Sequence, residues 1–360
     1  MFFHQNIAQE QSRFFCNLHQ NNMMLICHHI FFVLCLRGNC SMTYIYFSHK
    51  EKKYAFQIFV KCLFVLYNLI MICDSCPRHC KIDRSNNTGF CGTNNNIKLA
   101  KVDVFMLEEP VISGTNGSGA IFFSGCNLKC CFCQNYKISH ECFGREISTE
   151  RLIEIFKELE AKNVHNINLV SPSHYSLQIL EALKIYKPKL PVVWNSNGYE
   201  SLETLDKIAP FVDIFLVDLK FFDDELSQKY CKAKNYFDVA SKAIKSMIAY
   251  QPKLIYDESG LLKNGVVIRH LVMSNHVDDS LKLLDWIANN AKNNCLVSIM
   301  GQYTPYYKSS KYPEINRKLK PIEYKKVLNE AKKLKIENGF FQSLDSSDEM
   351  FIPIWDLKGV

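Results

Sequence analysis

Apolar segments alternate with helix-like segments between residues 118 and 334, and this alternation constrains the fold more than any other feature of the chain. The segment Asp213-Ile-Phe-Leu-Val-Asp218 is nearly continuously apolar, which is typical of a strand buried on both faces of a parallel sheet. The predicted strands are residues 120–124, 166–171, 191–196, 212–218, 265–272 and 295–301. The predicted helices are residues 148–162, 175–186, 202–208, 223–230, 236–250, 277–292 and 322–334.

Six strand–helix units in succession predict an α/β fold of the partial (β/α)6 TIM type, an open relative of the eightfold barrel. The alternative is a flat, doubly wound sheet. That fold would require a glycine-rich phosphate-binding loop after a strand, and the sequence offers none. Ser148, in Ser148-Thr-Glu-Arg-Leu, is the expected capping residue of the first helix.

A triplet of cysteines directly follows the first predicted strand, in the pattern CxxxCxxC at Cys126, Cys130 and Cys133. Soft thiolates suit iron–sulfur clusters, and three of them hold three corners of a [4Fe–4S] cube. The spacing supplies no fourth ligand nearby, so one iron is left open for a substrate. A structural zinc site would need four ligands in closed pairs, and a chance run of core cysteines would not give this spacing.

A second group of cysteines precedes the barrel at Cys73, Cys76, Cys80 and Cys91. With turn residues between them, these four predict a small knuckle that holds either structural Zn²⁺ or a second iron–sulfur cluster. The chain has 16 cysteines, and their grouping favours metal in a reducing compartment over a disulfide framework. Cysteines that stand apart are expected to be small hydrophobic residues: Cys16, Cys27, Cys62, Cys231 and Cys295. Cys131 is expected to be a bystander.

The first 70 residues differ in kind from the rest, with five His, five Cys, no Asp and no Pro. They hold six Lys and Arg against two Glu, so much of the formal charge of +7 lies there and the working domain is not markedly basic. The stretch 55–72 approaches membrane-spanning length but contains Lys61. We expect a disordered leader or translated upstream sequence with the functional start near Met71, in preference to a membrane anchor.

Polar residues stand at the carboxyl end of one predicted strand after another. In parallel barrels these ends meet on one face, where the chemistry gathers, so we expect a shared pocket. Each residue alone has a plainer explanation; Asp218 and Lys220, for example, could form a structural ion pair. The strand-end residues are Ser171, Ser173, His174, Asn195, Asn197, Asp218, Lys220 and Arg269.

These residues carry a resemblance to a known family. The segment Gly117-Ser-Gly-Ala-Ile-Phe-Phe-Ser-Gly-Cys-Asn-Leu-Lys-Cys-Cys-Phe-Cys-Gln-Asn-Tyr136 resembles the signature of the radical S-adenosylmethionine (SAM) superfamily. The motifs Cys76-Pro-Arg-His-Cys80, Glu108-Glu-Pro, Asp218-Leu-Lys and Ile268-Arg-His-Leu resemble its pyruvate formate-lyase-activating-enzyme-like branch. The similarity runs from about Cys73 to Pro353 and divides the chain into an extension (1–70), the knuckle (71–100) and the barrel (101–353).

The resemblance implies that Cys126, Cys130 and Cys133 ligate the cluster and that SAM chelates its fourth iron. Phe132 would lie against the adenine, and the segment holding Ser171, Ser173 and His174 replaces the family's glycine-rich SAM-amine motif without reproducing it. Asn195 and Asn197 would lie near the ribose, and Asp218, Lys220 and Arg269 match polar active-site positions. One electron from the reduced cluster would split SAM into methionine and a 5′-deoxyadenosyl radical, which abstracts a substrate hydrogen.

Three classes of function remain open at this point. The first is an activase that abstracts a glycine Cα hydrogen from a partner glycyl-radical enzyme. The second is a radical SAM enzyme that modifies another macromolecule or a small metabolite, and the third is a non-catalytic iron–sulfur or zinc protein. For this protein we expect a low-potential electron donor such as flavodoxin or ferredoxin, no nucleic-acid or membrane partner, and a cytoplasmic location in an anaerobic or facultative organism.

Overall fold

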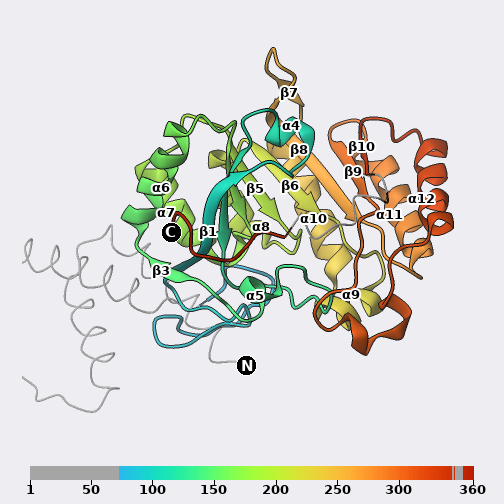
Figure 1. Cartoon of the computed structure of the whole chain (residues 1–360), viewed down its shortest axis with the longest axis horizontal. Helices are drawn as coiled ribbons and strands as arrows, with labels where there is room; N and C mark the ends of the chain where they lie inside the picture. The colour runs from blue at the N-terminus through green and yellow to red at the C-terminus, as the bar shows by residue number, and fades with distance from the viewer. Residues whose placement is uncertain (1–72, 343, 345–351) are drawn as a thin grey trace, which may run out of the picture. The chain divides into compact units, whose positions relative to one another are not determined.

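The computed structural model describes residues 73–342, 344 and 352–360, all within the compact unit Tyr67–Val360 (Figure 1). The expectations for residues 1–70, including the competing leader and anchor, lie outside the described residues. Within the described ranges, no helix is both long enough and apolar enough to span a bilayer.

A curved sheet forms the centre of this unit, with its strands in the order β10-β9-β8-β6-β5-β4-β2-β1-β3. From β2 to β10 every neighbouring pair along this order is parallel, whereas β1 pairs antiparallel with both β2 and β3. The strands are β1 (Ile97–Phe105), β2 (Ser118–Phe123), β3 (Arg145–Ile147), β4 (Ile167–Val170), β5 (Val192–Ser196), β6 (Ile214–Asp218), β7 (Ile255–Tyr256), β8 (Leu262–Leu271), β9 (Leu296–Met300) and β10 (Gly339–Phe341).

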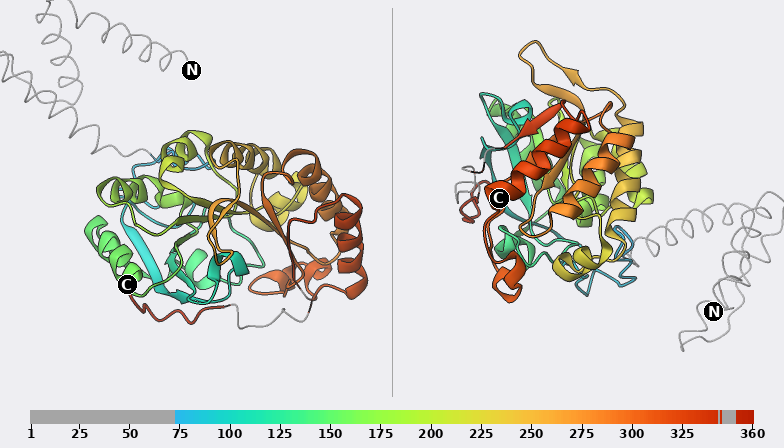
Figure 2. Two further views of the ribbon diagram at one scale, coloured as in Figure 1. Left: turned by 90° about the horizontal axis from the view of Figure 1, so that it is seen from above. Right: turned by 90° about the vertical axis from the view of Figure 1, so that its right-hand side faces the viewer.

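Helices connect the parallel strands and cover the outer face of the sheet (Figure 2). The long ones are α6 (Thr149–Ala161), α7 (Ser176–Ile185), α8 (Leu202–Ile208), α9 (Asp224–Cys231), α10 (Tyr236–Tyr250), α11 (Val277–Asn290) and α12 (Pro321–Lys333), and the short ones are α4 (Pro110–Ser113) and α5 (Tyr136–Ser139). The Oγ of Ser148 accepts the N–H of Arg151 at 3.2 Å, so the predicted cap of α6 is confirmed. The six predicted parallel strands and the open (β/α)6 barrel are confirmed as well.

Strand register sorts the side chains into an inner and an outer set, because alternate residues of a strand face opposite ways. Trp194, Phe215 and Ile268 belong to the large core that the outer helices share. Val193 and Ile214 are register partners and belong to a smaller apolar cluster with Ile112 of α4, which therefore closes part of the barrel interior. Farther along the strands from this apolar cluster, the side chains that face the barrel interior are polar, and these polar positions form the candidate site.

β1 adds an antiparallel flank that the sequence pattern did not predict, and the C-terminal segment bonds to it. The N–H of Val102 donates to the carbonyl of Lys358 at 2.8 Å, and Lys101 pairs with Asp356 at 2.9 Å. The division between knuckle and barrel that we placed at residue 100 falls inside β1. The barrel unit also continues past residue 353, because its last residues pack on β1.

Candidate active site

The cluster loop, residues 124–135, begins where β2 ends and carries all three cysteines of the triplet. It starts with a tight turn at Gly125, whose φ is +84°. A Cβ at this position would lie 2.5 Å from Cγ2 of Thr93, so only glycine fits. The backbone N–H of Cys126 then donates to the carbonyl of Cys91 at 3.3 Å, which ties the loop to the four-cysteine segment.

Polar groups lie beside two of the three sulfur atoms of the triplet, those of Cys126 and Cys133. The N–H of Leu128 and Nδ2 of Asn197 each lie 3.4 Å from Sγ of Cys126, and Oγ of Ser139 lies 3.2 Å from Sγ of Cys133. Hydrogen bonds to ligating sulfurs are one of the means by which proteins tune iron–sulfur clusters. Asn197 reaches this loop from the end of β5, so one of the predicted strand-end residues contacts a predicted cluster ligand.

Burial favours the neutral, protonated form of these thiols, so we expect them to become thiolates only when metal is bound. It raises the pKa of Cys126 to about 11 and that of Cys133 to about 12, while the contact with Cys231 and burial raise that of Cys130. A metal displaces such protons and stabilises the thiolates. In the described part of the chain no three His, Cys, Asp or Glu side chains surround one point as ligands of a single ion. A four-iron cube holds its thiolate ligands farther apart than a single ion does, and the three soft thiols of Cys126, Cys130 and Cys133, one buried and two half-buried, fit it.

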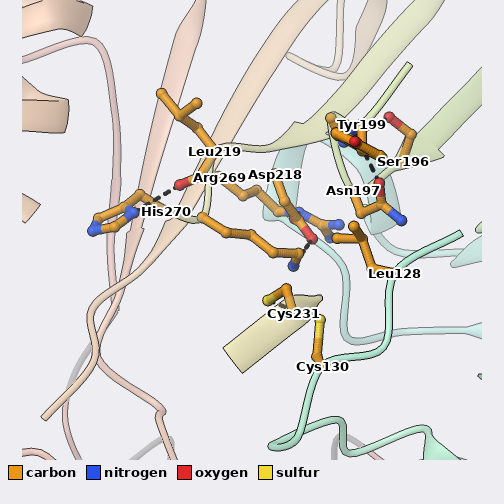
Figure 3. A network of polar contacts seen from close by, with 12 residues as sticks. Leu128, Cys130, Ser196, Asn197, Tyr199, Asp218, Leu219, Cys231, Arg269 and His270 are labelled. Atoms are coloured by element: carbon orange, nitrogen blue, oxygen red, sulfur yellow. Dashed lines mark hydrogen bonds and ion pairs between the residues drawn. The ribbon is translucent and has the colours of Figure 1, made fainter. Parts of the chain in front are cut away.

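Cys231 is buried in the hydrophobic core, as predicted for a small hydrophobic residue, but it is not isolated. It ends helix α9, and its Sγ lies 3.2 Å from Sγ of Cys130 (Figure 3). Its carbonyl also accepts the N–H of Lys129. A fourth thiol therefore lies beside the triplet, and the sequence did not show it because the two cysteines are 101 residues apart.

Asp218, Lys220 and Arg269 form one largely buried charged network at the ends of β6 and β8, and Figure 3 labels Asp218 and Arg269. The carboxylate of Asp218 accepts Nζ of Lys220 at 2.7 Å and Nε of Arg269 at 2.8 Å. Burial alone would raise the pKa of Asp218, but Arg269 and Lys220 outweigh it and hold this pKa below its ordinary value. Arg269 also donates to Oδ1 of Asn195 at 2.6 Å. Four predicted residues thus meet inside the barrel.

Glu108 completes this network and was not among the predicted site residues. Its carboxylate accepts Arg269 at 3.2 Å, Asn168 at 3.0 Å and Asn195 at 3.1 Å. The Glu108-Glu-Pro motif was visible in the sequence, but nothing local indicated that the segment after β1 turns into the barrel. Burial raises the pKa of Glu108 to about 7, against the opposing effect of Arg269.

Glu108 is expected to make the unfolding free energy depend on pH. Because its pKa in the folded chain lies above the ordinary 4.5, the folded state binds the proton more tightly between pH 4.5 and 7. The wild type should therefore lose stability as the pH rises through this window, by an amount on the order of 3 kcal/mol. Glu108→Gln should lack this contribution, which urea titrations of both proteins from pH 4.5 to 8 would measure. Identical pH slopes in the two proteins would contradict the assignment.

The segment after β4 lies near the cluster loop, but its side chains are engaged elsewhere. Oγ of Ser173 donates to Glu200 at 2.5 Å. Nε2 of His174 lies 2.7 Å from the carbonyl of Ser124, and burial lowers the pKa of His174 to about 3, so its ring is neutral. Ser171 adopts a left-handed φ of +59° and donates its N–H to the carbonyl of Asn195. These residues shape the strand end rather than join the charged network.

Phe132 is buried between two aromatic rings, with its centroid 5.9 Å from that of Tyr303 and 6.3 Å from that of Phe221. Both contacts are edge-to-face, the preferred arrangement of aromatic pairs. The aromatic side chain before the last cysteine therefore fixes the cluster loop against the segment that follows β9. Its predicted role beside an adenine stays a prediction.

The four cysteines of the knuckle lie together in the structure. A Cβ on Gly89 would be 3.4 Å from Sγ of Cys91 and 3.6 Å from Sγ of Cys80. Burial first, and then the neighbouring thiols of Cys73, Cys91 and Cys80, raise the pKa of Cys76 to about 12. The sequence grouping thus corresponds to a grouping in space.

Two arginines fasten the knuckle to the barrel. Nε of Arg78 donates to the carbonyl of Asn127 in the cluster loop at 2.7 Å. Nη1 of Arg84 donates to the carbonyl of His174 at 2.6 Å. The knuckle therefore braces the cluster loop and the end of β4 at the same time.

Comparisons with known proteins agree with this architecture. The model of the radical SAM superfamily matches residues 120–287. The uncharacterized protein MJ0674 of Methanocaldococcus jannaschii is 35% identical over 279 residues, covering 75% of this chain and 77% of that protein. The pyruvate formate-lyase-activating enzyme of Clostridium pasteurianum is 24% identical over 239 residues, covering 63% of this chain and 91% of that enzyme.

Among solved structures, SuiB of Streptococcus suis bound to S-adenosylmethionine gives a TM-score of 0.42 at 15% identity. The alignment covers 62% of this chain and 49% of SuiB, so the chain matches about half the length of that protein. The family match over β2 to α11 includes the cysteine triplet, and the related archaeal protein extends the similarity over three quarters of the chain. The chain belongs to the radical SAM superfamily.

Proposed function

We propose that this radical SAM enzyme is an activase-like protein that abstracts a hydrogen atom from the Cα of a glycine in a partner protein. The observation that carries the proposal is the buried network of Asp218, Lys220, Arg269 and Glu108, next to a cluster loop whose three thiols fit a [4Fe–4S] cluster. The relationship to a pyruvate formate-lyase-activating enzyme over 91% of that enzyme's length supports the choice of substrate.

Cys126, Cys130 and Cys133 would hold the cluster. When bound, the cluster and SAM supply a carbon-centred radical that removes a hydrogen atom from a strong C–H bond. Lys220 and Arg269 offer buried cationic groups for the methionine carboxylate, and charge-assisted hydrogen bonds of this kind are strong. Asn195 and Asn197 are candidates for the ribose hydroxyls, while the inner face of the sheet orients the substrate and excludes water.

The test follows the hydrogen atom itself. Reduced, reconstituted full-length chain would be mixed anaerobically with SAM and a glycyl-radical enzyme whose glycines carry deuterium at Cα. Transfer of deuterium into 5′-deoxyadenosine, together with a glycyl radical signal by EPR, is the expected result. Formation of 5′-deoxyadenosine without deuterium would instead favour a radical SAM enzyme that modifies another macromolecule or a small metabolite.

A non-catalytic iron–sulfur or zinc protein is the remaining class. The charged network argues against it, because a binding module has no use for two buried cations and two buried carboxylates beside an open cluster. Removing charged groups from water costs folding free energy, so a protein that needed no such network would not be expected to keep it. A reducible cluster that never cleaves SAM, even with the partner present, would favour this class.

The knuckle belongs to the proposal as a second metal centre. We expect Cys73, Cys76, Cys80 and Cys91 to bind Zn²⁺ or a second iron–sulfur cluster, because four clustered thiols suit either. Metal analysis separates the two: about four irons with zinc, or about eight irons without it. Cys76→Ser should lower only the second metal, and unchanged metal content in this variant would contradict the assignment.

A further inference from the structure

Arg78 of the knuckle reaches the place where the knuckle, the cluster loop and the end of α9 meet. Its Nε donates at 2.7 Å to the carbonyl of Asn127, which follows the first cysteine of the triplet. Its Nη1 donates to the carbonyl of Lys232, the residue that caps α9. One guanidinium therefore connects three segments that are distant in sequence, directly beside the triplet.

Two aromatic rings hold this guanidinium in place. Its central carbon lies 3.8 Å from the ring centroid of Phe90 and 5.2 Å from that of Tyr199. A cation above the face of an aromatic ring is attracted by the electrons of the ring. Because two rings and two hydrogen bonds act on the planar group, its orientation is fixed, and so is the position of its third nitrogen.

That third nitrogen, Nη2 of Arg78, is buried and has no hydrogen-bond partner among the residues that the structure describes. In the rigid fork of a guanidinium, one N–H of Nη2 is parallel to the N–H of Nε. It is therefore directed to the same side as the bond to Asn127, the side of the cluster loop. A buried donor without a partner destabilises a folded protein, so Nη2 offers hydrogens to an acceptor that the chain itself does not supply.

Sulfur atoms of both cysteine groups lie close to this guanidinium. Burial lowers the pKa of Arg78, and the neighbouring side chains that oppose this effect are Tyr199, Cys76, Cys126 and Cys130. Two of these belong to the triplet. A [4Fe–4S] cluster held by three thiolates has a net negative charge, so it suits a buried cation with unused N–H groups.

We propose that Arg78 donates hydrogen bonds from Nη2 to the cluster held by Cys126, Cys130 and Cys133, and that its positive charge raises the reduction potential of this cluster. Reduction adds one electron from a low-potential donor, forms and breaks no bond, and makes the cluster more negative by one charge. A neighbouring cation stabilises that reduced form, because hydrogen bonds and net charge set the potential. The inference depends on the cluster and is independent of the substrate.

The experiment measures this potential in the reconstituted full-length chain, by anaerobic titration with dithionite followed by EPR, without SAM. The signal that is missing in Cys130→Ala identifies the triplet cluster. Arg78→Met and Arg78→Gln both remove the charge, so they should bind the added electron about tenfold more weakly, which lowers the potential by about 59 mV. Arg78→Lys keeps the charge without the fork and should recover about half of this shift.

Arg84→Met is the matched control. Arg84 is a buried arginine of the same knuckle and also donates to the barrel, at 2.6 Å to the carbonyl of His174. Its other hydrogen bonds go to Thr93 and Asn94, so none of the three acceptors lies in the cluster loop. Its replacement should loosen the attachment of the knuckle and leave the potential of the triplet cluster unchanged.

The proposal is overturned if a neutral Arg78 variant with a full triplet cluster keeps the wild-type potential, or if Arg84→Met shifts the potential as far as Arg78→Met does. Iron content decides the case in which neither neutral variant assembles the cluster. Iron retained in Arg78→Lys then supports the proposal, because the charge holds the cluster, and iron lost from all three Arg78 variants overturns it. Since neither SAM nor substrate takes part, these outcomes are distinct from a failure of deuterium transfer in the proposed activase reaction.

Discussion

Replacing Cys130 with alanine is expected to reduce the iron of the triplet site from about four atoms per chain to nearly none. Cys130 is buried and Cys126 and Cys133 are half-buried, and the loss of one thiol leaves two ligands for a cube that needs three from the protein. The measurement is iron content and cluster absorbance after anaerobic reconstitution, read beside the unfolding curve of each variant. SAM cleavage should fall to background in the same protein.

Cys131→Ala is the matched control for this experiment. Cys131 is the next residue in the chain and is also buried, but it lies outside the CxxxCxxC spacing, and its backbone groups bond to Tyr230 and Lys308. We expect it to keep the iron of the triplet site. Cys231→Ala should keep it as well, because Cys231 contacts Cys130 without belonging to the triplet. Equal iron loss in the Cys130 and Cys131 variants would contradict the ligand assignment.

Replacing Arg269 with methionine is expected to cost about 3–5 kcal/mol of unfolding free energy, the range for breaking a buried ion pair from one side. The change leaves Asp218 with Lys220 alone and leaves Glu108 with only the amides of Asn168 and Asn195. Denaturant titration at neutral pH measures the loss. Because Glu108 takes up a proton more readily once the guanidinium is gone, part of the stability should return at lower pH.

Arg151→Met provides the comparison for this second prediction. Arg151 also pairs with two carboxylates, Glu154 and Glu158, but on the exposed face of α6. Surface ion pairs contribute little, so its loss should cost less than about 1 kcal/mol. If Arg269→Met and Arg151→Met lower the unfolding free energy by the same amount, the ion pairs inside the barrel contribute no more than surface ion pairs, which contradicts this account.

Apart from β10, which was not predicted, the parallel part of the fold was predictable because each strand carries its own signal. The near-continuous apolar run of β6 and the capped start of α6 are local features, and both were found in the structure where the sequence indicated them. β1 was missed because its role depends on distant partners. It pairs with β2 in the antiparallel sense and with the C-terminal segment, whose Lys358 lies more than 250 residues away.

The candidate site divides in the same way. The strand-end pattern predicted that Asn195, Asp218, Lys220 and Arg269 would meet, since parallel strands bring their ends to one edge. It did not predict that Ser173 would be engaged by Glu200, because that contact depends on the turn after β5. Glu108 contacts Arg269 because the chain turns into the barrel after β1. No local sequence pattern predicts that turn.

The most direct test of the account is whether the reconstituted full-length chain, reduced under anaerobic conditions, converts SAM into 5′-deoxyadenosine and methionine. The account predicts slow release of both products in equal amounts, above the level of the Cys130→Ala variant. A protein with a complete, reducible cluster whose EPR signal does not respond to SAM, and which forms no 5′-deoxyadenosine, would contradict it.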